Sequence, residues 1–64
     1  MRVNGKDYPY RAGLTLLALL DELQVDSRRV VVMQGDDIHS AGKIPDAPVS
    51  ERDTIEIVTM MQGG

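Results

Sequence analysis

The stretch of sequence that decides the fold reads Thr15-Leu16-Leu17-Ala18-Leu19-Leu20-Asp21-Glu22-Leu23. Leucines at positions 16, 19, 20 and 23 have the spacing that places side chains on one face of an α-helix. Thr15 precedes them, and its hydroxyl can accept a hydrogen bond from a backbone N–H that the first helical turn leaves unpaired. The sequence therefore predicts one amphipathic helix that begins after Thr15, buries its leucine face and ends near residues 25–27.

A β-hairpin is predicted before this helix. Residues 1–3 favour a short strand, and Asn4-Gly5 follows it. Asn-Gly is a strong hairpin signal because a type I′ turn needs a positive φ at both of its central positions. We expect the return strand over residues 6–11, where Pro9 lacks the N–H that a ladder requires. This return strand should therefore lie at an edge of the sheet.

Two more strands are predicted directly after the helix. Val30-Val31-Val32-Met33 is a nearly continuous β-branched run, which is typical of a strand buried on both faces. Gly35 lies in the turn that follows, and residues 37–39 are expected to form a short return strand.

The chain then enters a loop and a last strand. Residues 40–50 contain two prolines, so we expect an irregular loop whose apolar anchors are Ile44 and Val49. Residues 54–59 alternate well enough to predict a strand with its two isoleucines, Ile55 and Ile57, facing the core.

These elements together predict an α+β fold. A single helix is expected to pack on one face of a mixed sheet of four to five strands. The first and last strands would be central parallel neighbours joined by a right-handed connection. This arrangement is the β-grasp, or ubiquitin-like, architecture. We expect residues 1–60 to form the β-grasp domain and residues 61–64 to form a flexible C-terminal tail ending in Gly-Gly.

Length and composition exclude several functions. Sixty-four residues make one small domain, which argues against an enzyme with a deep active site of its own. The chain has no Cys, so it offers no disulfide, thiolate metal site or thiol nucleophile. Its net charge of −3 argues against nucleic acid and anionic membranes as partners. With no signal peptide and no apolar run long enough to span a bilayer, a cytoplasmic location is expected. The free chain is expected to be a monomer.

Side chains with catalytic potential are scarce. His39 is the single histidine and has no partner nucleophile, so a solvated loop position is expected for it. The carboxylates of Asp36, Asp37 and Asp46 lack the spacing of a calcium-binding loop and are interpreted as solvated. The sequence therefore predicts no metal site and no cofactor bound by the chain itself.

One feature points to chemistry: Gly63-Gly64 comes shortly after the last predicted strand. A free α-carboxylate, with a pKa of about 3.5, is a poor electrophile at neutral pH unless it is activated, for example as an acyl-adenylate. Glycine has no Cβ, so such a segment can pass through a narrow channel. From Met60 it could extend about 13 Å at ~3.3 Å per residue. Gly64 is thus the candidate reactive residue and Gly63 provides access, the alternative being a frayed terminus without a role.

The chain resembles the ThiS family of ubiquitin-like sulfur carriers over almost its whole length. The matching pieces occur in the family's order and spacing, and they are Val3-Asn4-Gly5-Lys6, Gly13, Thr15-Leu16, Leu19-Leu20, Glu22-Leu23, Val30-Val31-Val32, Asp53, Ile55-Glu56-Ile57-Val58 and Gly63-Gly64. Two turns depart from the pattern, with Gln34-Gly35 in place of Asn-Gly and Arg52 in place of Gly. Both departures concern turn geometry and not the C-terminal segment.

The resemblance implies a carrier and not a catalyst. A ThiF-like adenylyltransferase would use ATP and Mg²⁺ to convert the Gly64 carboxylate into an acyl-adenylate. Sulfur from a cysteine desulfurase or another donor would then displace AMP and leave a thiocarboxylate on Gly64. A ThiG-like thiazole synthase would take this sulfur into the thiazole ring in thiamine biosynthesis.

Other functions stay open at this point. The small subunit of molybdopterin synthase has the same fold and thiocarboxylate, but such proteins are longer and richer in aromatic residues than this chain, which has no Phe and no Trp. A ubiquitin-like modifier would need the same activated Gly64 to form isopeptide bonds. A plain interaction module would not use the terminal glycines at all.

Overall fold

The computed structural model describes residues 1–59, and the predicted flexible tail of residues 61–64 lies outside this described part. In chain order the elements are β1 (Arg2–Val3), β2 (Lys6–Asp7), α1 (Leu16–Glu22), β3 (Val30–Gln34), β4 (Asp37–His39) and β5 (Thr54–Thr59). They form a five-stranded sheet in the order β2-β1-β5-β3-β4. β1 runs parallel to β5, and the other neighbouring strands are antiparallel. The predicted mixed sheet with its single helix and central parallel pair is therefore confirmed.

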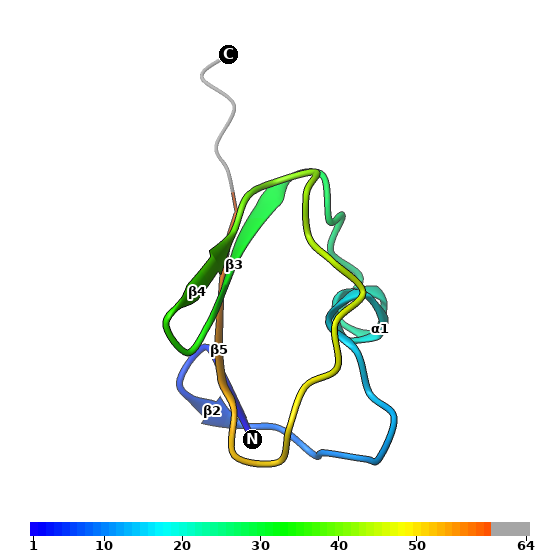
Figure 1. Ribbon diagram of the computed structural model, residues 1–64, viewed down its shortest axis with the longest axis vertical. Coiled ribbons are helices and arrows are strands. Elements are labelled where there is room, and N and C mark those ends of the chain that lie inside the picture. The colour runs from blue at the N-terminus through cyan, green and yellow to red at the C-terminus, as the bar shows by residue number, and fades with distance from the viewer. Residues whose placement is uncertain (60–64) are drawn as a thin grey trace.

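Helix α1 begins as the sequence predicts. The Thr15 hydroxyl accepts a hydrogen bond from the backbone N–H of Ala18 at 3.2 Å. Three leucines of the apolar face, Leu16, Leu19 and Leu20, are at most 2% exposed. Figure 1 shows α1 nearly end-on beside the sheet, so the helix crosses the strands on one face only.

α1 ends at Glu22, before the predicted end near residues 25–27, and it ends in a motif that the sequence did not predict. The Val25 N–H donates to the carbonyl of Leu20 at 3.0 Å, and the Gln24 N–H donates to the carbonyl of Asp21 at 3.0 Å. This pair of bonds is a Schellman motif, which places the residue after the C-cap in the left-handed region. Glycine usually occupies that position, but here it is Gln24, with φ of 60°.

Replacing Gln24 by glycine is expected to stabilise the protein by about 0.5–1 kcal/mol. The gain is the relief of a left-handed conformation that is costly for any residue with a Cβ, less the extra backbone entropy of glycine. Thermal or urea unfolding of Gln24→Gly measures this gain. The control is Gln24→Ala, which keeps the Cβ and should not be stabilised; a glycine variant no more stable than the alanine variant would contradict this account.

The N-terminal hairpin turns at Asn4 and Gly5, which have φ of 53° and 81° as a type I′ turn requires. The return strand β2 lies at the sheet edge as predicted, but it ends at Asp7 and does not continue to Arg11. Pro9 cannot donate to the ladder. The residues on both sides of Pro9 contact α1 instead: Glu22 accepts a hydrogen bond from the Tyr8 hydroxyl at 2.7 Å and pairs with Arg11.

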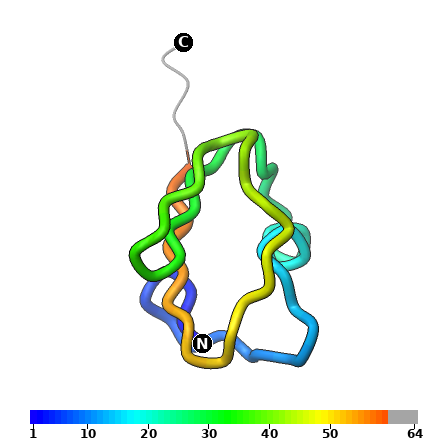
Figure 2. The backbone as a smooth tube through the Cα atoms, viewed as in Figure 1, coloured from blue at the N-terminus to red at the C-terminus, as the bar shows by residue number. Residues whose placement is uncertain are grey.

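The long connection between β4 and β5 closes the far side of the core. Figure 2 shows it running from the upper end of the sheet, past α1, to the lower end. The Leu16 N–H donates to the carbonyl of Ala47 at 2.8 Å, and the Val49 N–H donates to the carbonyl of Leu14 at 3.0 Å. The predicted anchors Ile44 and Val49 are both buried. The core therefore lies between one sheet face, α1 and this connection.

Candidate functional site

β5 is the last described element before the C-terminal segment, and it is paired on both sides. On one side it pairs with β3 from Ile55 to its last residue, where Thr59 lies opposite Val30. On the other side β1 supplies only two residues. Asn4 extends this ladder. Its backbone N–H donates to the carbonyl of Ile55 at 2.9 Å, and its side-chain Oδ1 accepts a hydrogen bond from the Ile57 N–H at 2.7 Å. The hairpin turn thus also fixes the latter half of β5.

The start of β5 is fixed by the carboxylate of Asp53. It accepts hydrogen bonds from the Gln34 amide at 2.9 Å, the Ser50 N–H at 2.8 Å and the Ser50 hydroxyl at 2.9 Å. Burial by itself would raise the pKa of Asp53, but these hydrogen bonds outweigh it and lower the pKa below its ordinary value. Asp53 therefore stays ionised at neutral pH and ties the turn before β5 to the end of β3.

The sheet has an apolar outer face that the sequence analysis missed. β3 was predicted to be buried on both faces, yet only Val30 and Val32 are buried, and both belong to the face that α1 covers. The opposite face carries a cluster that we call the outer patch, and its members are Val31, Met33, Ile38 and Val58. Ile38 is 68% exposed and Val58 is 50% exposed. The sequence predicted one short helix, which can cover only one face of a sheet. From this alone, an uncovered face with apolar side chains could have been predicted.

The outer patch lies beside the end of β5 that leads to the predicted reactive residue. Val58 belongs to β5 itself and pairs with Val31 of β3, while Met33 pairs with Ile38 of β4. Exposed apolar clusters rimmed by polar residues are characteristic of protein–protein contact surfaces. The candidate site is therefore an interaction surface next to the C-terminal end of the sheet.

The remaining predictions about site residues have mixed outcomes. Gly63 and Gly64 lie outside the described residues. His39 does not occupy a solvated loop as expected: it ends β4 opposite the buried Val32, and its Nε2 is buried without a hydrogen-bond partner among residues 1–59. Within the same residues, no group of His, Asp or Glu is arranged to hold a metal ion. No helix in the described part is long and apolar enough to cross a membrane.

Comparison with known proteins agrees with the fold. The sequence model of the ThiS family matches residues 1–64. A sulfur carrier protein ThiS from Thermus thermophilus is 34% identical over 62 residues, which cover 97% of this chain and 95% of that protein. A thiazole synthase from Paramagnetospirillum magneticum is 37% identical over 62 residues, which cover 97% of this chain but only 19% of that protein. The β-grasp architecture, the order of its motifs and these matches together show that the chain belongs to the ThiS family.

Proposed function

We propose that this protein is a sulfur carrier of thiamine biosynthesis whose reactive atom belongs to the carboxylate of Gly64. The observation that carries the proposal is the match, over nearly the full length of both chains, to a relative named as a sulfur carrier protein. The small core, the outer patch and the scarcity of catalytic side chains support a protein co-substrate on which other enzymes act. The cytoplasm is the predicted location of this chemistry.

The chemistry begins with activation of the carboxylate. A carboxylate oxygen of Gly64 attacks the α-phosphorus of ATP, held with Mg²⁺ by a ThiF-like adenylyltransferase, and pyrophosphate leaves. The terminal sulfur of a persulfide, carried by a cysteine desulfurase or another donor, then attacks the acyl carbon, and AMP leaves with the bonding electrons. A thiol supplies the two electrons that cleave the S–S bond of the resulting acyl persulfide, and Gly64 ends as a thiocarboxylate. In this scheme Gly63 contributes the absence of a side chain, which allows the segment to enter a narrow active site.

Thiazole synthase is the acceptor that the comparisons favour. A segment similar to nearly all of this chain forms part of a protein named as a thiazole synthase. Two activities joined in one polypeptide act at high effective concentration, which is useful when one passes a product to the other. This supports thiazole formation over the alternative role of molybdopterin synthase small subunit and over protein modification.

We further propose that the outer patch docks the adenylyltransferase. Residues 60–64 span at most about 17 Å at ~3.3 Å per residue, so an enzyme that acts on Gly64 must lie close to the end of β5. Val58 of the patch is one residue from that end. A partner surface that covered the patch would bury the exposed apolar side chains and hold the enzyme within reach of Gly64.

Ile38→Asp is expected to raise the KM of the adenylyltransferase for this chain by about tenfold or more without unfolding it. Burying an isoleucine side chain is worth about 1.5–3 kcal/mol, and ~1.4 kcal/mol corresponds to a tenfold change. Because Ile38 is 68% exposed, its replacement should leave the free energy of unfolding nearly unchanged. The matched control is Leu17→Asp on α1, and equal KM values for the two variants would rule out docking through the patch.

Reconstituted sulfur transfer tests the acceptor. The thiocarboxylate form of the chain is mixed separately with thiazole synthase and its substrates, with the large subunit of molybdopterin synthase and its substrate, and with a lysate rich in lysine-bearing proteins. The proposal predicts that thiazole synthase consumes the thiocarboxylate and forms thiazole. Sulfur delivered only to the pterin substrate, or covalent attachment of the chain to lysines, would contradict it.

A further inference from the structure

The turn between α1 and β3 contains two neighbouring arginines that the proposed function has not used. Arg28-Arg29 is the only place in the sequence where two basic residues are adjacent, in a chain whose net charge is −3. Both side chains are exposed, at 81% and 74%. Two cations held at one point of an acidic protein form a local field that differs in sign from the rest of the molecule.

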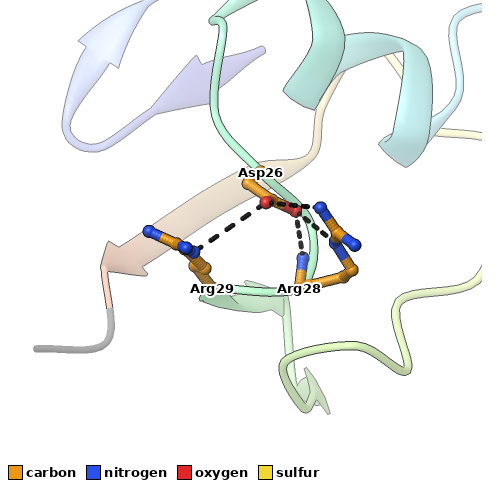
Figure 3. Close-up of polar contacts among 3 residues, drawn as sticks. All are labelled: Asp26, Arg28 and Arg29. Atoms are coloured by element: carbon orange, nitrogen blue, oxygen red, sulfur yellow. Dashed lines mark hydrogen bonds and ion pairs between the residues drawn. The ribbon is translucent and has the colours of Figure 1, made fainter. Parts of the chain in front are cut away.

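One carboxylate lies in ion-pair range of both guanidinium groups. Asp26 accepts hydrogen bonds from Arg28 at its Nε and Nη2, each 3.1 Å long, and from the Arg28 backbone N–H at 2.9 Å. Arg29 Nε lies 3.9 Å from the same carboxylate, and its backbone N–H donates to the Asp26 carbonyl at 2.9 Å. Figure 3 shows the two arginines on either side of Asp26. The hydrogen bonds from Arg28 lower the pKa of Asp26, so this carboxylate is charged at neutral pH.

The pair keeps a positive charge and unused donors. Two guanidinium groups share one carboxylate, and within residues 1–59 Asp26 is the only acidic residue in contact with either. A guanidinium carries five N–H donors in a planar fork that fits a carboxylate. Because Asp26 already restricts Arg28, less side-chain entropy is lost when the turn binds a further anion.

The turn lies at the end of β5 that leads to Gly64. Thr59, the last residue of β5, pairs with Val30, and Arg29 directly precedes Val30 in the chain. In Figure 3 the tip of the β5 arrow lies on the side of Arg29. The short reach of residues 60–64 therefore brings any enzyme that acts on Gly64 close to this turn as well as to the outer patch.

We propose that Arg28 and Arg29 dock onto carboxylate side chains of the enzyme that adenylates Gly64. This inference rests on the proposed function, and it assigns a second, electrostatic contact beside the apolar one. A polyanion such as nucleic acid is disfavoured, because a pair half-neutralised by Asp26 in an acidic chain offers few contacts to a phosphate backbone. An acidic patch on a protein needs only one or two complementary guanidinium groups.

Isotope exchange between pyrophosphate and ATP measures this docking, because adenylation of Gly64 is reversible. The double variant Arg28→Gln/Arg29→Gln is compared with Arg52→Gln, which removes an exposed cation at the opposite end of β5. At low ionic strength the double variant should have a KM for the chain about tenfold above that of the wild type, with kcat within about twofold. Near 1 M salt, where the Debye length is only ~3 Å, most of this difference should vanish. Arg52→Gln should behave as the wild type in both conditions.

Two results separate this inference from the function on which it rests. If the wild type supports exchange and both glutamine variants have the same KM, or if the defect persists unchanged at high salt, the arginine contact is wrong and the carrier function stands. If the wild-type chain supports no exchange at all, the proposed function fails and the docking inference fails with it. Thermal unfolding of each variant establishes that the comparison is made between folded proteins.

Discussion

Deleting Gly64 is expected to abolish sulfur acceptance while the free energy of unfolding stays unchanged. The deletion removes the proposed acyl carbon. The new terminal carboxylate belongs to Gly63 and ends about 3.3 Å short of the position that the Gly64 carboxylate would reach beside the α-phosphorus of ATP. The buried core and the residues packed against it lie between residues 1 and 57, so the deletion removes no core contact among the described residues.

A second variant distinguishes the loss of the terminal carboxylate from the shortening of the chain. The full chain with its terminal carboxylate converted to an amide keeps every residue but has no carboxylate oxygen to attack ATP. It should accept no sulfur, and its urea unfolding curve should match that of the wild type. Incorporation of sulfur into either the shortened or the amidated protein would contradict the assignment of Gly64.

Leu20→Ala is expected to cost about 2–5 kcal/mol, the range for truncation of a buried leucine. Leu20 is 2% exposed and lies on the face of α1 that packs against the sheet. A domain of this size has a total stability of only about 5 kcal/mol, so the variant should be largely unfolded at 37 °C.

The matched control for this prediction is on the same helix. Leu17 is 36% exposed, so Leu17→Ala removes the same atoms from a position that the core does not enclose. Its cost should be below about 1 kcal/mol. Two-state unfolding in urea compares the two variants, and equal losses, or a loss for Leu20→Ala under about 1 kcal/mol, would show that the apolar face of α1 has been misassigned.

The elements that were predicted well are those whose signal is local. Asn4-Gly5 forms a turn with two positive φ angles, and Thr15 caps the start of a helix. Few residue types can fill either role, and both are found at the predicted positions. Strand β2 was predicted to reach residue 11 but ends at Asp7. Pro9 ends the pairing of this strand with β1 because the residues around it make other contacts. These contacts are with Glu22 of α1, which is distant in sequence and binds both Tyr8 and Arg11.

The errors on β3 and at the end of α1 have tertiary causes. A run of valines predicts a strand but not how many of its faces are covered, and only the packing of α1 shows that Val31 and Met33 belong to an open face. Gln24 adopts a left-handed conformation because the Schellman bonds and the packing of the chain enforce it, against the preference of the residue itself.

The candidate site was predictable only in part. Gly63-Gly64 is visible in the sequence, and the role proposed for it rests on membership of the ThiS family. The outer patch and the Arg28-Arg29 pair could not be predicted as parts of one site. They lie at the same end of β5 only because of the register that sets Val30 opposite Thr59. No local pattern encodes this register, which arises from the pairing of residues that lie 21 to 29 positions apart in the chain.

The intact mass of the chain shows whether the Gly64 carboxylate becomes a thiocarboxylate. The protein is incubated with ATP, Mg²⁺, a ThiF-like adenylyltransferase and a sulfur donor, and a parallel sample lacks only ATP. If Gly64 is the sulfur acceptor, the mass increases only in the sample with ATP, by the difference between one sulfur and one oxygen, and fragmentation locates the change at Gly64. An unchanged mass, under conditions in which the same enzymes convert an established ThiS protein, would show that Gly64 is not the sulfur acceptor.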